Sequence, residues 1–246
     1  MQLEQTQIHT QPARRKVPGW LLAFGIALLA AGIMFLPFII YEKGNFFFFG
    51  DFNVQQIPFY RMAHDAVRSG EVLWNSYTDL GANFIASYSF YLLFSPFFWL
   101  TLPFPSAAVP YLMAPLLMLK FALSSLTAYA YLRRFVRPDF AVMGGLLYAF
   151  SGFSIYNVFF NHFHEAIVYF PLMLLALEMY MKDGKRGFFA VTVFLSALSN
   201  YYFFIGQVFF LLIYWFVRMF SGDWDCSLSK FLWLLFEAVV GTAGAA

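Results

Sequence analysis

A series of long apolar segments constrains this fold more than any other feature of the sequence. The first, Pro18 to Tyr41, runs for 24 residues without a charge. A helix of that length crosses the roughly 30 Å hydrocarbon core of a bilayer. Charged residues make up only 11% of the chain, less than half the roughly 25% of soluble domains. Together these features predict an all-α, multi-spanning membrane protein whose further apolar segments are 88–102, 106–132, 140–160, 166–181, 188–199, 201–217 and 228–246.

Most of the basic residues fall into clusters between these segments. Of the 15 Lys and Arg residues, eleven form four groups: Arg14, Arg15 and Lys16; Arg133, Arg134 and Arg137; Lys182, Lys185 and Arg186; Arg218 and Lys230. Basic residues predominate in cytoplasmic loops, so all four groups are cytoplasmic if the chain crosses the membrane twice between successive groups. This topology places the N-terminus in the cytoplasm and the long loop 42–87 outside. That loop carries five acidic and three basic residues.

The same topology allows one crossing between the outer loop and the second basic cluster. Helix 106–132 supplies it, and segment 88–105, which is interrupted by Pro96, Pro103 and Pro105, is predicted to be re-entrant or interfacial. Two hairpins follow, with outer turns at 161–166 and at Asn200. We therefore expect the outer loop and both hairpin turns to lie on one side of the membrane.

The outer loop contains one segment with helical periodicity, from Gln55 to Ser69. It places apolar side chains on one face, and Arg61, His64, Asp65 and Arg68 form a more polar side. This pattern predicts a short interfacial helix, with Pro58 in its first turn and Gly70 as its stop. The following segment, "EVLWNSYTDLGANF", has no period and is predicted to be an ordered loop.

The domain organisation follows from these assignments. Residues 1–17 are predicted to be a disordered cytoplasmic tail, and residues 18–246 a single transmembrane domain that begins with a retained signal anchor. The sequence stops inside an apolar segment, so we expect it to be the N-terminal part of a longer protein. Cys226 is the only cysteine, which excludes an intramolecular disulfide and a multi-cysteine metal site. A formal net charge of +2 gives no indication of nucleic-acid binding.

Several motifs of the first half resemble one known family. Gly50-Asp51, "QQIPFY", "LWNSYTDLGANF" and "YLLFSPFFWLTLPFP" follow the first helix in that order. This arrangement resembles the N-terminal part of the bacterial YfhO family of multi-spanning membrane proteins. The resemblance covers roughly residues 18 to 220 and is most specific in 50–105. The family is grouped with the GT-C glycosyltransferases, which implies a GT-C-like helical fold and an acidic residue in the first outer loop. The matching position is Asp51.

The resemblance implies a membrane glycosyltransferase active on the outer face. It would move a sugar from a polyprenyl-phosphate donor to a cell-envelope acceptor, for which the family suggests teichoic or lipoteichoic acid. Asp51 would act as the base that takes the acceptor proton. The leaving phosphate needs positive charge or hydrogen-bond donors, and the candidates on the outer side are Arg61, His64, Arg68, His162 and His164. The prenyl chain needs an apolar groove, which the many Phe and Tyr side chains would line.

Each of these residues also has a simpler interpretation. Gly50-Asp51 is equally typical of a turn, and Arg61 and Arg68 of the solvated face of an interfacial helix. His162, His164 and Glu165 would satisfy loop amides, or supply two imidazoles and a carboxylate to a metal ion. Nothing else in the sequence completes such a metal site, so no metal or cofactor is predicted.

Three further residues have open roles. Lys120 lies inside an apolar helix, where a charge faces a cavity or a partner. It would contact a lipid phosphate, or pair with Glu178 or Glu237. Asn200 and Tyr201 would bind substrate at the second outer turn. The alternative for Tyr201, as for Tyr202 beside it, is the aromatic belt at the membrane interface.

Two other classes of function compete with the transferase. A transporter or flippase for a lipid-linked substrate also has intramembrane charges and broken helices, but the inverted repeat that would favour it is not evident in the sequence. A non-catalytic membrane assembly subunit would use Asp51 only as a turn residue.

Overall fold

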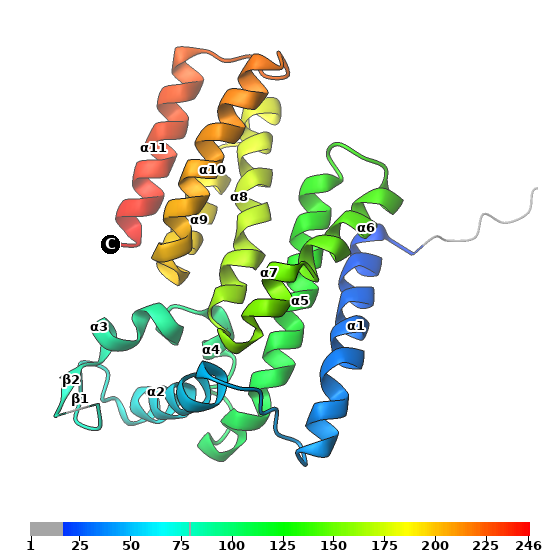
Figure 1. The fold of residues 1–246 in the computed structure, drawn as a ribbon. Helices are drawn as coiled ribbons and strands as arrows, with labels where there is room; N and C mark the ends of the chain where they lie inside the picture. The colour runs from blue at the N-terminus through cyan, green and yellow to red at the C-terminus, as the bar shows by residue number, and fades with distance from the viewer. Residues whose placement is uncertain (1–16, 79) are drawn as a thin grey trace, which may run out of the picture.

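A computed structural model describes residues 17–78 and 80–246 and shows a helical bundle with a folded loop at one end (Figure 1). The predicted tail 1–16, with its basic cluster, and Asp79 lie outside the described residues. Within the described part, five segments are long and apolar enough to cross a membrane: Gly19–Tyr41, Ser106–Leu132, Pro138–Phe159, Phe163–Asp183 and Tyr201–Phe220. The main helices are α1 (Gly19–Tyr41), α5 (Val109–Leu132), α6 (Pro138–Ala149), α8 (Phe163–Asp183), α9 (Phe188–Ser199), α10 (Tyr201–Phe220) and α11 (Leu228–Gly244). The prediction of a multi-spanning helical protein is confirmed.

Helix α5 is central to the bundle because it packs against α1, α6 and α8. Helix α1 presents Ala23, Ala27 and Ala31, all fully buried, at four-residue spacing along one face. The Ser125 hydroxyl donates to the Ala23 carbonyl oxygen at 3.0 Å. On the other side, a Cβ at Gly145 would lie 2.6 Å from the Ser125 carbonyl oxygen. Small residues therefore allow α1 and α6 to approach α5 closely.

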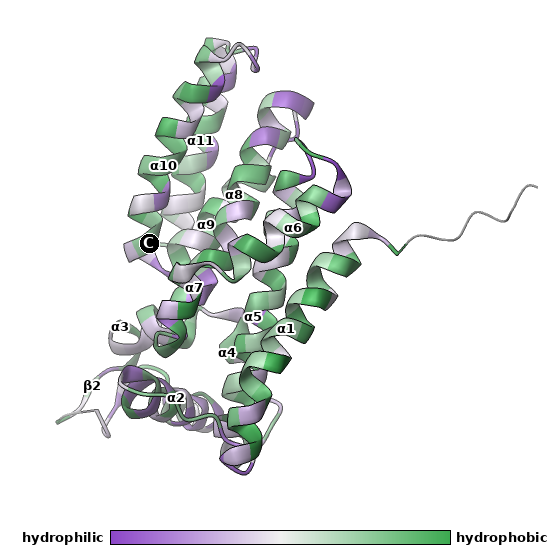
Figure 2. Ribbon diagram, turned by 45° about the vertical axis from the view of Figure 1, so that its right-hand side comes forward, coloured by the Kyte–Doolittle hydropathy of each residue, from purple (hydrophilic) through white to green (hydrophobic). Residues whose placement is uncertain are grey.

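The helix connections separate into two ends. The α5–α6, α8–α9 and α10–α11 connections lie together at one end of the bundle, called here the basic end (Figure 1). The first two contain basic residues, and the third is flanked by Arg218 of α10 and Lys230 of α11. The first loop and the starts of α8 and α10 lie toward the other, the loop end. Figure 2 shows hydrophobic residues along the helices and hydrophilic ones concentrated at the connections and in α2. The connections alternate between the two ends in the order that the basic clusters predict, and the side of the membrane that each end faces stays a prediction.

The loop end is built from short elements. The helix predicted at 55–69 appears as α2 (Ile57–Ser69), preceded by a π-helical turn, η1 (Phe52–Gln56), and stopped at Gly70 with φ +81°. The segment 71–84, predicted to be a loop, contains a small hairpin of β1 (Trp74–Asn75) and β2 (Ala82–Asn83). The segment before α5 contains α3 (Phe84–Tyr88), η2 (Ser89–Leu93), α4 (Pro96–Trp99) and η3 (Ser106–Ala108), none long enough to span a membrane. The re-entrant or interfacial placement of 88–105 stays a prediction.

The hairpin predicted from 140 to 181 differs from expectation in two places. Helix α6 ends at Ala149, and a second short helix, α7 (Gly152–Tyr156), begins after Ser151, whose side chain caps it. A 3₁₀ turn, η4 (Asn157–Phe159), follows. Helix α8 begins at Phe163, so His164 and Glu165 lie in its first turn and not in an open loop.

Candidate functional site

A fully buried ion pair lies near the loop end, between α5 and α8. The Lys120 ammonium donates to the Asn161 carbonyl oxygen at 3.0 Å, to Asn161 Oδ1 at 3.1 Å and to Glu165 Oε1 at 2.9 Å. Lys120 is 0% and Glu165 1% exposed. An ammonium has three N–H donors, so Lys120 has none left for a lipid phosphate. The pairing alternative is confirmed, but the predicted partners Glu178 and Glu237 are wrong.

Glu165 extends this cluster to the segment before α5. Its Oε1 accepts a short hydrogen bond from the Ser95 hydroxyl. Ser95 is also the N-cap of α4, where its Oγ accepts from the Phe98 N–H at 3.4 Å. The Lys120 ammonium lies 5.0 Å from the centroid of the Phe97 ring, within cation–π range. One ion pair thus joins α4, α5 and α8.

His162 connects the start of α8 to the first loop, between α1 and α5. Its Nδ1 lies 3.2 Å from Gln56 Oε1, and Gln56 Nε2 donates to Gln55 Oε1 at 3.1 Å. Because the Gln56 amide nitrogen is directed at Gln55, its oxygen faces the ring, and Nδ1 must carry the proton. Burial, with the nearby Lys120 charge, lowers the pKa of His162 to about 3. A neutral ring supplies no positive charge to a phosphate, so the predicted phosphate role of His162 is replaced by a structural link.

His164 is also buried and internally bonded. Its Nε2 lies 3.3 Å from the Asn157 carbonyl oxygen, and its ring is 5.0 Å from that of Phe121. These contacts match the alternative in which the histidine satisfies a loop carbonyl. Among the described residues, no group of three or more His, Cys, Asp or Glu side chains is placed to hold a metal ion.

Asp51 occupies the start of η1, after Gly50 with φ +56°. The turn before it is held by Asn53, whose side chain accepts from the Phe48 N–H at 3.0 Å and donates to the Phe48 carbonyl at 3.1 Å. Phe52 is fully buried and anchors the turn. The partly exposed Asp51 carboxylate forms no hydrogen bond or ion pair within residues 17–78 and 80–246. Asp51 is therefore not the side chain that holds this turn.

Arg61 is the predicted phosphate-binding residue that faces open space. It is exposed and lines a groove of about 730 Å³ between α2 and the β1–β2 hairpin, whose other polar lining residues are Asp65, Ser69, Glu71, Asn75 and Tyr77. Arg61 follows Asp51 by ten residues of nearly continuous helix, and a rise of 1.5 Å per residue places their backbones roughly 15 Å apart. The two residues therefore lie in separate parts of the first loop.

His64 and Arg68 have internal roles that the sequence did not indicate. His64 is fully buried, with Nε2 3.0 Å from the Phe104 carbonyl oxygen, to which Arg68 also donates at 2.8 Å. Ser106 donates to Asp65 Oδ2 at 2.9 Å beside them. These bonds tie α2 to the start of α5. The prediction that His64 lies on the polar side of the helix is wrong, and neither residue faces the Asp51 turn.

The two predicted site residues at the α9–α10 turn also differ from each other, since one is buried and the other exposed. Asn200 is 1% exposed and caps α10 by accepting from the Phe203 N–H at 3.3 Å. Tyr201 is exposed, and its ring lies 5.3 Å from that of Phe90, which is itself 5.0 Å from His162. Of the predicted site residues, Lys120, His162, His164 and Glu165 are brought together, while Asp51, Arg61 and Tyr201 are accessible in separate places.

The comparison with known families decides the identity of the chain. The family model of the bacterial membrane protein YfhO matches residues 23–245. This chain belongs to the YfhO family. No curated protein and no solved structure matches it. The family match extends well beyond 50–105, the part with the most specific motifs.

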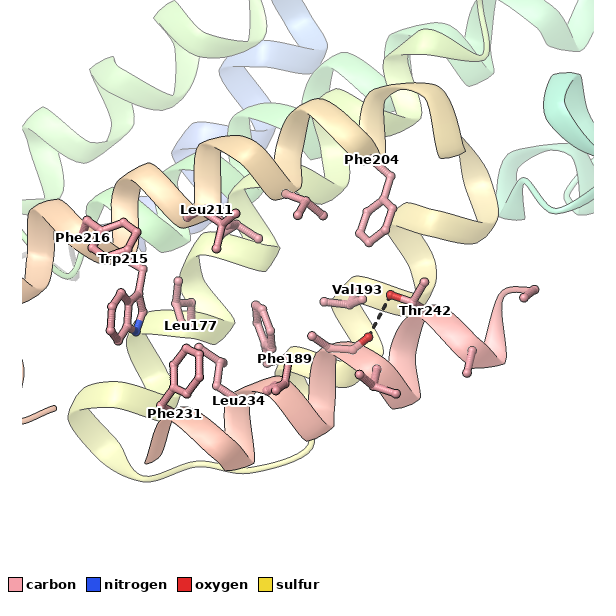
Figure 3. Close-up of a pocket in the computed structure, with 17 residues that line it drawn as sticks. Leu177, Phe189, Val193, Phe204, Leu211, Trp215, Phe216, Phe231, Leu234 and Thr242 are labelled. Atoms are coloured by element: carbon pink, nitrogen blue, oxygen red, sulfur yellow. Dashed lines mark hydrogen bonds between the residues drawn. The ribbon is translucent and has the colours of Figure 1, made fainter. Parts of the chain in front are cut away.

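An apolar groove in this YfhO family protein lies among α8, α9, α10 and α11 (Figure 3). It has a volume of about 660 Å³, and its lining is almost entirely hydrophobic, with Phe189, Phe204 and Trp215 among the aromatic residues. The hydroxyl of Thr242 donates to the Ala238 carbonyl oxygen at 2.8 Å. A groove of this composition suits a hydrocarbon chain.

Sequence reasoning missed Gln56, Ser95 and Asn161, the neutral residues that complete the buried cluster of this YfhO family protein. The signal that was available is Lys120 itself, because a charge inside an apolar helix requires nearby acceptors. Acidic and amide residues at the start of the facing helix are the first place to look for them.

Proposed function

We propose that this YfhO family protein is a membrane glycosyltransferase that moves a sugar from a polyprenyl-phosphate donor to a cell-envelope acceptor, with Asp51 as its base. The observation that carries the proposal is the state of Asp51. This carboxylate at the loop end is partly exposed and has no hydrogen-bond or ion-pair partner among the described residues, and the side chain of Asn53 holds the turn. Family membership supports the assignment. A free acceptor oxygen within reach of solvent is what a general base requires.

The chemistry is a single displacement at the anomeric carbon. The acceptor hydroxyl oxygen bonds to that carbon as the bond to the donor phosphate oxygen breaks, and Asp51 takes the hydroxyl proton. The phosphate leaves on its prenyl carrier, and the apolar groove of Figure 3 suits such a chain. Because Arg61 lies roughly 15 Å from Asp51, we assign the α2 groove to the acceptor. Arg61 supplies the charge for an anionic polymer such as teichoic or lipoteichoic acid, and Tyr77 and Asn75 offer hydrogen bonds.

The orientation belongs to the same proposal. Basic residues gather at the end opposite Asp51, and such residues favour the cytoplasm, so the loop end faces outward. Cys226 is exposed at the basic end and is a natural reporter. A membrane-impermeant maleimide applied to intact cells should leave Cys226 unmodified. In a Cys226→Ser background it should label Val54→Cys, at a position that is 74% exposed, and spare Lys185→Cys. The reverse pattern would overturn the orientation.

The activity is tested by sugar incorporation into the envelope polymer in a deletion strain. Complementation with Asp51→Asn should lower incorporation by about 10²–10⁴-fold, the usual contribution of a general base. Glu42→Gln is the matched control, since it neutralises another carboxylate of the same loop, and it should retain activity. Normal incorporation by an Asp51→Asn protein present at wild-type levels would show that Asp51 is not the base.

A transporter of a lipid-linked substrate is the second candidate. The buried Lys120–Glu165 pair and the break between α6 and α7 are features of such proteins. Labelling at position 54 distinguishes the two, because a transporter that alternates its access changes accessibility when substrate is added. In a transferase whose site stays on the outer side, adding substrate leaves the labelling of position 54 unchanged.

A further inference from the structure

The buried Lys120–Glu165 pair is connected to Asp51 by an unbroken series of contacts. We propose that this pair is a positioning device: it docks the first outer loop on the bundle and so fixes the place of Asp51. The proposal rests on the proposed function for the role of Asp51, and on geometry alone for the docking. Neither Lys120 nor Glu165 touches substrate, so both are positioning residues.

The pair itself is rigid because every donor is used. Lys120 gives its three N–H groups to Asn161 and Glu165, and Glu165 Oε1 also receives the Ser95 hydroxyl. A buried ion pair is tolerated only where geometry and hydrogen bonding are complete. Any displacement of one partner leaves an uncompensated charge in a dry environment. The pair therefore holds its neighbours in one arrangement.

The first branch runs from Lys120 to η1. Lys120 holds Asn161 by both its backbone and its side-chain oxygen. The next residue, His162, donates from Nδ1 to Gln56 at the end of η1, and Asp51 stands at the start of the same turn. The ring of His162 is enclosed by Phe90 and Tyr91, at 5.0 and 5.2 Å. A shift of Asn161 would thus be transmitted to η1 and to Asp51.

The second branch runs from Glu165 to α4 and α2. Ser95 bonds Glu165 and caps α4, in which Phe98 packs edge-on against Tyr60 of α2 at 5.5 Å. The fully buried hydroxyl of Tyr60 lies beside Ser95 and Asn161. The elements on either side of the hairpin, η1–α2 and α4, therefore meet the same ion pair. Because a displacement of about 1 Å in a catalytic group lowers rates roughly 100-fold, this docking bears directly on turnover.

Accessibility of a buried position on α2 tests the docking without any assay of sugar transfer. Ala63 is 0% exposed, and Ala63→Cys in a Cys226→Ser background should resist an impermeant maleimide on intact cells. Lys120→Met should raise its labelling rate at least tenfold. Arg218→Met is the matched control, because it removes a buried ion-pair partner at the opposite end, and it should leave position 63 protected.

Gln56→Leu provides a milder variant that keeps the ion pair and removes the hydrogen bonds of Gln56 to His162 and to its neighbour Gln55. It should fold, and it should lower the kcat of sugar transfer about 10-fold while the donor KM stays the same, a split that a general loss of folded protein would not produce. Protection of position 63 in Lys120→Met, or an unchanged kcat in Gln56→Leu, overturns the inference. Full activity of Asp51→Asn together with exposure of position 63 would instead remove the proposed base and leave the docking in place.

Discussion

Two buried ion pairs stabilise opposite ends of this bundle, and they differ in their access to water. At the loop end, Lys120 and Glu165 are both enclosed, with side chains 0% and 1% exposed. At the basic end, Glu178 is equally buried, but its partner Arg218 is 15% exposed and also contacts Asp223 near the surface. Arg218 binds Glu178 through Nε at 2.8 Å and Nη2 at 3.1 Å. Tyr214 and Trp224 donate to the same carboxylate.

This difference in exposure to water indicates what each ion pair does. Arg218 extends from the end of α10 toward water, and it joins Glu178 of α8 to Asp223 of the adjacent α10–α11 connection. Lys120 lies halfway along α5, and its partners are a turn and a helix start that also contact the first loop. The same kind of ion pair thus holds the end of a helix at the basic end and the whole first loop at the loop end.

The largest predicted effect comes from breaking the enclosed pair. Lys120→Met leaves Glu165 buried without its cation, and such losses cost about 3–5 kcal/mol. Arg218→Met should cost less, about 1–2 kcal/mol, because Tyr214 and Trp224 still donate to Glu178. Thermal unfolding of the purified proteins in detergent, followed by tryptophan fluorescence, compares the two. Adding Glu165→Gln to Lys120→Met should recover part of the loss, and equal destabilisation by the two single variants would contradict the contrast.

The second effect depends on pH and belongs to the loop end. The pKa of His162 falls from its ordinary 6.5 to about 3 in the folded protein, so between these values the unfolded state binds more protons. Stability is therefore complete above pH 6.5 and decreases as the pH falls toward 3. At pH 5 the loss is about 2 kcal/mol. His162→Gln should show a smaller decrease in melting temperature from pH 7.5 to 5 than wild type, and parallel pH curves would disprove this origin.

A smaller effect is expected at the basic end from Glu237. Its carboxylate caps α9 from a neighbouring helix by accepting from the N–H groups of Gly187 at 2.8 Å and Ala190 at 3.1 Å. Glu237→Gln keeps one acceptor oxygen and loses the charge near the helix N-terminus, which should cost about 1 kcal/mol. The same unfolding measurement detects it. A loss as large as that of Lys120→Met would mean that both ends depend equally on buried charge.

The smallest effect is expected from the pair Arg134–Asp183, which joins two connections at the basic end. Two bonds of 2.9 and 3.0 Å link the guanidinium and the carboxylate, but both side chains are partly exposed. Arg134→Ala should cost less than about 1 kcal/mol, and the difference should shrink in high salt. A large loss of stability that does not change with salt would show that the membrane encloses this pair more than the protein alone does.

The sequence was sufficient for the long apolar helices and for the helix in the first loop because both depend on local patterns. Charge clusters separate the spans, and the periodicity from Gln55 to Gly70 specifies α2. The partner of Lys120 was not predictable in that way. The apolar segment counted from 166 left Glu165 in the preceding turn, whereas the helix begins at Phe163, and no pattern within one helix states which residues face it from another.

His64 shows a second limit. Its polarity indicated the exposed side of α2, but the Phe104 carbonyl oxygen lies close to that side and accepts a hydrogen bond from His64 Nε2. Contacts over forty residues of chain decide such burial, and they arise from tertiary packing. Asp51 stood out in the sequence through the motif around it, yet its freedom from internal bonds became evident only once Asn53 was seen to hold the turn.

The bonds of Asn53 to Phe48 have a consequence for engineering. Asn53 holds the turn, and the base that we propose is a different side chain two positions earlier, so a substitution at position 51 should leave the backbone of the turn unchanged. Alanine there should leave a vacant space of carboxylate size at the surface. A small acid such as formate, added from solution, then supplies the carboxylate that the alanine variant lacks.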